Sequence, residues 1–342
     1  TKTAACSGVP KWTTAHLPDA YKLFFPRYFC PLLRSMHAAR APWASIHVED
    51  VQAIFDAFEM EEVAEIGGVW MDLGQYRLND SHTKLAKAAI VRVTELFDQD
   101  EFLGDDLVGR AERIRAYVEH AITEVGVGKD KSAPMHWQRW GDGTHKTGFL
   151  QTDLILATFS IHLQETECTL PDDSAMPLRD HPRPVAKLII SAQAVQRALG
   201  FFSTGEFVAP KQKNRKDDFS ANNYGDYQER NEKGKLKSKN RATKWVKTLT
   251  NWTPATWERV VANAAAWLPD TAQSKSVSAA TTPAASEAES ASDSDSDGSF
   301  IIQSDDEAFD DLGIGADAYD SMGVGDAVDE GTGEHPSGYA AV

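Results

Sequence analysis

Cysteine is scarce in this chain of 342 residues, which holds three: Cys6, Cys30 and Cys168. They lie far apart and show no Cys-x-x-Cys spacing, so we predict neither a disulfide framework nor a cysteine-based zinc site. A sparse, odd set of thiols is typical of a reducing compartment. We therefore expect an intracellular protein.

Long apolar runs and the common catalytic motifs are also missing. No stretch approaches the roughly 18 apolar residues of a membrane helix, and residues 1–40 show no signal-peptide pattern. Nothing matches the H-E-x-x-H, P-loop or G-x-S-x-G spacings. We expect no membrane contact, no cofactor and no bound metal, while the motifs leave enzymatic activity undecided.

Basic residues are nearly absent from the C-terminal segment. From Asp270 to Val342 there are 17 acidic residues and one basic residue, Lys275, so this segment carries the whole net charge of −16. Residues 1–269 hold 34 residues of each sign. Small and acidic residues replace the large apolar ones after position 269, and such a composition cannot bury enough apolar surface to offset chain entropy. We predict a disordered acidic tail over 270–342.

Apolar residues at three- and four-residue steps dominate the first 269 positions, and alternating strand patterns are few. We predict an all-α fold: a single irregular domain of about seven to nine helices over 41–269. Residues 1–40, rich in aromatics and proline, form an arm that packs on it. The expected helices follow Pro31 or cover about 45–58, 80–97 (capped by Asp80 or Ser81), 105–125, 149–163, 185–199 and 253–268 (capped by Thr253, with Pro254 in its first turn). One more carries Trp245, Val246 and Leu249.

Several short runs, in a fixed order, resemble those of a known protein family. They are Trp70 with 75–78 (QYRL), 137–143 (WQRWGDG), His181-Pro182 before 194–199 (AVQRAL), 203–206 (STGE) and 219–226 (FSANNYGD). The order resembles a large family of uncharacterised proteins of mushroom-forming fungi (basidiomycetes) that share a domain of unknown function. The resemblance covers about 15–268 and implies a fungal source but no activity. Tyr224 stands where the family usually has tryptophan before Gly-Asp.

The loop from Trp137 to His145 holds the densest group of chemical side chains. His136, Asp142 and His145 could face one cleft and bind a ligand or transfer protons. The alternative, which we favour, is a Gly-Asp-Gly turn whose tryptophans anchor it to the core. The same aromatic-Gly-Asp unit recurs at 224–226, and we interpret both aspartates as caps that accept backbone amides. Similarly, Ser203-Thr204-Gly205 is read as a turn after Gly200.

The most informative charged segment runs from Lys211 to Lys247, with twelve basic and five acidic residues. A base stands at every second position over Lys233, Lys235, Lys237, Lys239 and Arg241. Three interpretations stay open: contacts to nucleic-acid phosphates, a nuclear import signal, and a solvated loop neutralised by the acidic tail. No base-reading module is visible, so any nucleic-acid binding should be largely non-specific.

The tail itself contains two candidate partner segments. Serines alternate with aspartates over 292–297, a context for phosphorylation. Phe300-Ile301-Ile302, flanked by acids and serines, resembles a SUMO-interacting motif that adds a strand to its partner. The alternative is a solubilising tail whose apolar residues have no partner.

These observations favour a non-enzymatic helical interaction protein, with the nucleus as the compartment that the basic segment suggests. Its basic segment would contact nucleic acid, and its tail would bind an unidentified protein partner. The alternative hypothesis is an enzyme, or a metal- or ligand-binding protein, with its site at 137–145.

Overall fold

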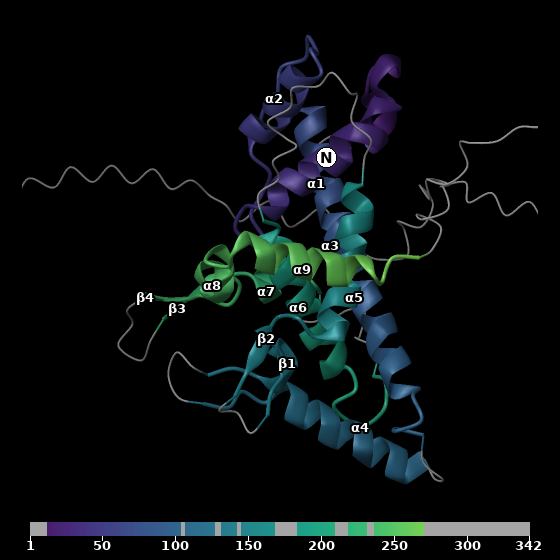
Figure 1. The fold of residues 1–342 in the computed structure, drawn as a ribbon. Coiled ribbons are helices and arrows are strands. Elements are labelled where there is room, and N and C mark those ends of the chain that lie inside the picture. Colours follow the sequence, from purple (N-terminus) through teal and green to yellow (C-terminus); the bar gives the residue numbers. More distant parts are fainter. Residues whose placement is uncertain are drawn as a thin grey trace, which may run out of the picture. The chain divides into compact units, whose positions relative to one another are not determined.

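The computed structural model describes residues 12–103, 107–126, 131–141, 145–167, 183–208, 218–230 and 236–269 (Figure 1). The predicted all-α class is confirmed, since helices account for most of these residues and the only sheets among them are two small hairpins. The tail motifs at 292–297 and 300–302 lie outside the described residues. The α-helices are α1 (Cys30–Ala38), α2 (Val48–Ala57), α3 (Val69–Phe97), α4 (Leu107–Ile122), α5 (Asp153–Thr166), α6 (Val185–Gly200), α7 (Ala221–Tyr224), α8 (Val246–Thr250) and α9 (Pro254–Ala265).

The central core forms where α3, α5 and α6 pack against one another (Figure 1). Helix α6 is buried on nearly every face, because α1, α4 and α8 also contact it. Its apolar residues Leu188, Ile189 and Val195 join Leu85 and Phe159 in the interior. Helix α9 lies across α5 and adds Val260 to the same core.

Helix α3 is longer than predicted. The expected cap near Asp80 and Ser81 does not exist, because the helix begins at Val69 after Gly68 and continues through both residues. Ser81 is fully buried, and its hydroxyl donates to the Glu165 carboxylate of α5 at 2.5 Å. A partner across the helix interface thus satisfies a polar residue that the local pattern suggested as a cap.

A second core combines aromatic and aliphatic side chains from the N-terminal segment, α1, α2 and the first half of α3. A π-helical turn, Phe25–Phe29, leads directly into α1. Phe25 and Phe29 stack on each other at a centroid distance of 5.3 Å, and Trp70 of α3 lies within 5.8 Å of both rings. The N-terminal segment is therefore part of the folded body.

Two antiparallel hairpins were not predicted. Strands β1 (Trp137–Arg139) and β2 (Thr147–Phe149) form one, and β3 (Tyr227–Arg230) and β4 (Leu236–Lys239) form the other. Leu150, at φ 52°, turns the chain after β2, so α5 begins at Asp153 and not at Phe149. In β4 the base at every second position is a strand period, because successive side chains point to opposite faces.

Local signals at several helix ends are confirmed. Thr253 caps α9 through a hydrogen bond from the Thr256 amide at 3.2 Å, with Pro254 at the first helical position. Helix α6 ends at Gly200, and the following turn brings Gly205 to φ 93°. A Cβ on Gly205 would lie 2.2 Å from the Ala111 carbonyl oxygen, so this turn requires glycine.

Candidate functional site: a basic and aromatic groove

The basic hairpin and helix α6 together line a concave surface of about 780 Å³. Four cationic side chains line it: Arg197 of α6, Lys239 of β4, and Arg241 and Lys244 beyond β4. Four aromatic side chains lie among them: Phe201, Tyr224, Tyr227 and Trp245. We call this surface the basic groove.

Cations and rings of the basic groove lie against each other. The Arg197 guanidinium lies 4.6 Å from the centre of the Phe201 ring, and that of Arg241 lies 4.9 Å from Tyr227. The Lys244 ammonium lies 4.3 Å from the Trp245 ring. Such pairs hold charge and flat apolar surface side by side. The groove therefore presents both kinds of contact that a polyanion with aromatic groups would need.

Asp226 fixes one wall of the basic groove. Its carboxylate accepts the amides of Ala242 and Thr243 at 2.7 and 3.1 Å and the Thr243 hydroxyl at 2.5 Å. The prediction that the second aspartate of the aromatic-Gly-Asp units caps a backbone is thus confirmed; the first, Asp142, lies outside the described residues. Gly225 allows the turn, because a Cβ there would lie 2.4 Å from the Ala221 carbonyl oxygen.

One carboxylate, Glu124, lines the basic groove and is already paired. It lies 3.5 Å from the Lys244 ammonium and 3.2 Å from that of Lys131. Burial raises the pKa of Glu124, but the two lysines together lower it below its ordinary value. The groove lining carries four cations against this single anion, so its net charge is positive.

Only some of the five basic residues predicted to contact nucleic acid line the basic groove. Lys233 and Lys235 lie outside the described residues. Lys237 and Lys239 share one face of β4, opposite Glu229 and Tyr227 of β3, and Lys239 pairs with Glu229 at 3.3 Å. Lys239 and Arg241 reach the basic groove, whereas Lys237 is not among its lining residues.

The predicted ligand site at the Trp137–His145 loop is not assembled by the described residues. His136 is buried, His145 is exposed, and Asp142 lies outside the described part of the chain. Burial, with the charge of Lys244, lowers the pKa of His136 to about 4. Its ring packs edge-on against Trp245 at 4.6 Å, so His136 supports the basic groove from behind. Within the described residues, no cluster of histidine, cysteine and carboxylates fits a metal ion.

Sequence reasoning missed Arg197, Phe201 and Tyr227 as site residues. Arg197 and Phe201 belong to a helix end about 40 positions before β4, and no local pattern links them to the lysines. The available signal was the aromatic content around the basic segment, since Tyr224, Tyr227 and Trp245 all lie near it in sequence.

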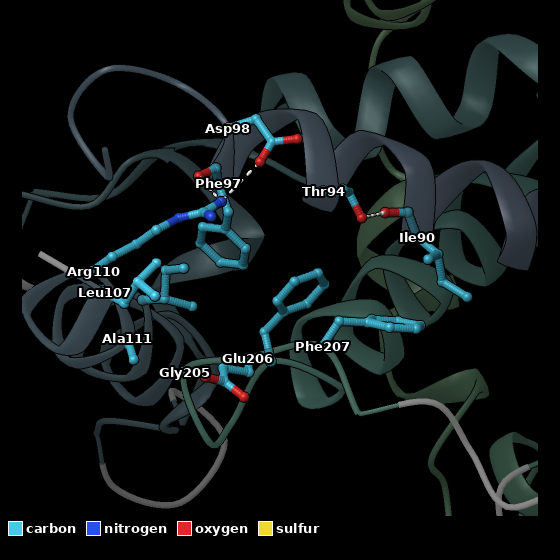
Figure 2. Close-up of a pocket in the computed structure, with 12 residues that line it drawn as sticks. Ile90, Thr94, Phe97, Asp98, Leu107, Arg110, Ala111, Gly205, Glu206 and Phe207 are labelled. Atoms are coloured by element: carbon cyan, nitrogen blue, oxygen red, sulfur yellow. Dashed lines mark hydrogen bonds and ion pairs between the residues drawn. The ribbon is translucent and has the colours of Figure 1, made fainter. Parts of the chain in front are cut away.

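A second cavity, of about 480 Å³, lies between α3, α4 and the turn after α6. Figure 2 shows Phe97 and Phe207 beside it, with the ion pair between Arg110 and Asp98 at 2.8 Å. The Thr94 hydroxyl donates to the Ile90 carbonyl oxygen of its own helix at 2.9 Å. Arg110, Asp98 and Thr94 therefore already have partners within the protein, which leaves them less suited to binding a ligand. The basic groove is the stronger candidate site.

No protein-family model, curated protein or solved structure matches this chain. The resemblance to a basidiomycete family of unknown function therefore stays a prediction. Among the residues that the structure describes, no helix combines the length and apolar character of a membrane span.

Proposed function

We propose that this protein binds single-stranded nucleic acid in the basic groove and acts as a non-enzymatic interaction protein. The observation that carries the proposal is the combination of four cations and four aromatic rings on one concave surface. Proteins that bind single strands without sequence preference combine a positive groove with rings on which bases stack.

The aromatic rings favour a single strand over a duplex. Bases in a duplex are stacked on each other and hidden from a ring at the protein surface, whereas unpaired bases can stack on Tyr227 or Trp245. Tyr227 is 39% exposed, although the Arg241 guanidinium lies 4.9 Å from its ring. Among the described helices and strands none forms a base-reading module, so the binding should tolerate many sequences.

Direct measurement of binding tests the proposal. The full-length chain is titrated into a fluorescent oligo(U) or oligo(dT), and anisotropy is recorded between about 50 and 200 mM salt. Up to four phosphate contacts predict a slope of log K against log salt of about −3, at roughly 0.7 per contact. A duplex of the same length should bind more weakly.

Two variants and one control sharpen this test. Replacing Lys239 and Lys244 by glutamine should weaken binding about tenfold and reduce the salt slope by about 1.4. Tyr227→Ala should weaken binding by about 5- to 100-fold with the slope unchanged, because stacking carries no counterion release. Lys87→Gln, an exposed change on α3 outside the groove lining, should have less than a twofold effect. Absence of binding by the unaltered chain at low salt would end the proposal.

The location and partners of the protein belong to the same proposal. A nucleic-acid binder with a basic hairpin fits the nucleus, and the tail, with its net charge of −16, offers a surface for a basic protein partner. Microscopy of the tagged full chain checks the location. A cytoplasmic signal that persists when nuclear export is blocked would contradict it.

A further inference from the structure

A second group of polar side chains is buried where α1, α3, α5 and α6 meet. Lys187, the third residue of α6, is fully buried. Its positive charge helps to lower the pKa of His37 of α1 and of His82 of α3. In turn, the charge of Glu165 of α5 raises the pKa of Lys187, and the charge of Arg34 of α1 lowers it. His162 of α5 completes the group through its effect on His82. We call these six residues the buried cluster. None of them lines either of the two cavities described above.

Three potential donor atoms in the buried cluster lack a hydrogen-bond partner within the described part of the chain. They are Nζ of Lys187, Nε of Arg34 and Nε2 of His82. Two further atoms of the cluster, Nδ1 of His37 and Oε1 of Glu165, also lack a partner there. Lys187 and His82 are at most 4% exposed, and the side chain of Arg34 is 11% exposed. Buried polar groups in folded proteins are almost always bonded, so three such atoms in one place require an explanation.

Charge in the buried cluster is also unbalanced. Glu165 is the one carboxylate among these six residues. Ser81 donates to its Oε2 at 2.5 Å, and its Oε1 lies 3.1 Å from the Lys84 ammonium but accepts no hydrogen bond within the described part of the chain. The Arg34 guanidinium lies farther away, at 3.7 Å. Arg34, Lys84 and Lys187 thus share a single carboxylate, so the cations outnumber it.

The N-terminal end of helix α6 adds to the positive electrostatic potential around Lys187. Lys187 stands in the first turn of this 16-residue helix, where the helix dipole is positive and where no side chain caps the backbone. The first three residues of α6 are all buried. A cation is therefore unfavourable at this position, and an anion would be favourable.

From these contacts we propose that the buried cluster is a binding site for a small oxyanion of the phosphate type. Arg34, Lys187 and His82 supply donors from three helices, and the first turn of α6 supplies the dipole. An oxyanion would accept hydrogen bonds from all three donors. Its negative charge would balance the positive charge that Glu165 alone does not neutralise. The proposal is independent of nucleic-acid binding in the basic groove.

Trp43 covers the buried cluster. Its ring lies 4.9 Å from His82 on one side and 6.4 Å from Tyr224 of the basic groove on another. Its indole donates to Gln193 at 2.8 Å, and His37 contacts the Ala44 carbonyl oxygen at 2.6 Å. Trp43 has a φ of 64°, a left-handed conformation unusual for a bulky residue. Trp43 thus contacts both His82 of the buried cluster and Tyr224 of the basic groove.

Inorganic phosphate is the probe for the first experiment. Melting of the full-length chain is followed at pH 7 in phosphate and in chloride of equal ionic strength. Phosphate should raise the melting temperature by about 3 °C or more once its concentration is tenfold above Kd. Equilibrium dialysis with labelled phosphate should give about one site that survives an excess of chloride.

Variants separate this site from the basic groove. Lys187→Met keeps an unbranched side chain and removes the ammonium group, and we expect it to fold and to lose the phosphate effect. The paired change Lys239→Gln and Lys244→Gln, which alters only the basic groove, should keep the effect. If Lys187→Met still responds like the unaltered chain, or if the unaltered chain shows no response, the proposal is overturned.

A pH series on the unaltered chain tests the site without any substitution. Sulfate keeps its charge between pH 6 and 9, whereas burial lowers the pKa of Lys187 to about 7. Burial, with the charge of Lys187, lowers the pKa of His37 to about 4 and holds that of His82 well below its ordinary value, so neither ring gains a proton in this range. Sulfate binding should therefore weaken at least about threefold from pH 6 to 9; constant binding would contradict the assignment.

Discussion

At the scale of single residues, Lys187 has the most unusual surroundings in the described part of the chain. Burial lowers its pKa from 10.5 to about 7, with smaller and opposing effects of Glu165 and Arg34. Burial likewise lowers the pKa of the neighbouring His37 to about 4. Exchanging a buried charged group for an apolar one of similar volume is often stabilising. A lysine kept at such a position at a cost to stability is a candidate for a role in binding.

Replacing this lysine should change both stability and its dependence on pH. Between pH 7 and 10.5 the unfolded chain binds a proton at Lys187 that the folded chain does not, so the contribution of Lys187 to stability rises with pH. Lys187→Met should stabilise the protein by about 1–4 kcal/mol at pH 7, and the gain should shrink toward pH 10. Denaturant unfolding of both chains at several pH values measures this difference.

The comparison of the two chains removes the effect of other groups. Burial raises the pKa of Cys30 to about 11, which alone would lower stability above pH 9, but it does so equally in both chains. A constant stability difference from pH 7 to 10 would show that Lys187 does not titrate as described.

At the scale of elements, the hairpin β3–β4 depends on contacts made beyond its own strands. Every residue of the two strands themselves is exposed, so the strands bury little apolar surface. Asp226 ties the start of β3 to the segment after β4, and the Arg241 guanidinium donates to the Asn223 carbonyl oxygen. Gln193 of α6 donates to the Tyr224 carbonyl oxygen at 2.9 Å, which connects the hairpin to the core.

Loss of the Asp226 carboxylate should loosen this element. Asp226→Ala leaves the Ala242 and Thr243 amides without their acceptor and should destabilise the chain by about 1–2 kcal/mol. Nucleic-acid binding should weaken as well, because Arg241 and Lys244 lose their fixed positions. Hydrogen exchange of the amides of 242 and 243 checks the structural effect.

A second capping position provides the control for Asp226. Thr253→Ala removes the cap of α9 and should cost a similar free energy, about 1 kcal/mol, while leaving nucleic-acid affinity unchanged. Equal losses of affinity in the two variants would show that the effect follows stability and not the groove.

At the scale of the whole molecule, the distribution of charge is the dominant property. The first 269 residues are neutral overall, yet the basic groove gathers cations on one surface, and the tail carries the net charge of −16. A tethered anionic segment competes with nucleic acid at a high effective concentration. The tail is thus expected to weaken binding in the intact chain.

Removal of the tail tests this competition. All the described helices and both cores lie before residue 270, so a chain of residues 1–269 retains them. It should bind a single strand about 3- to 10-fold more tightly than the full chain at low salt, with the difference fading at high salt. Adding the tail as a separate peptide should weaken the binding again. Equal affinities at low salt would exclude this competition.

The sequence by itself determined the helical class and several helix ends. Apolar periodicity and caps are local properties, so α6 and α9 could be predicted from Val185 to Leu199 and from Thr253-Pro254. The partition of charge could also be read directly, because it needs no folded contact. The second aromatic-Gly-Asp unit was interpreted correctly as a backbone cap, but only the structure showed that the amides Asp226 accepts are those of Ala242 and Thr243, beyond β4.

Only the tertiary structure decided where function can reside. The basic groove joins Arg197, Lys239 and Lys244, and the buried cluster joins Arg34, His82 and Lys187; each set comes from segments far apart in the chain. Ser81 shows the physical reason: its local pattern suggests a cap, but Glu165 on another helix binds its hydroxyl. Local propensity sets the type of an element, whereas the burial and charge of a side chain depend on which elements pack around it.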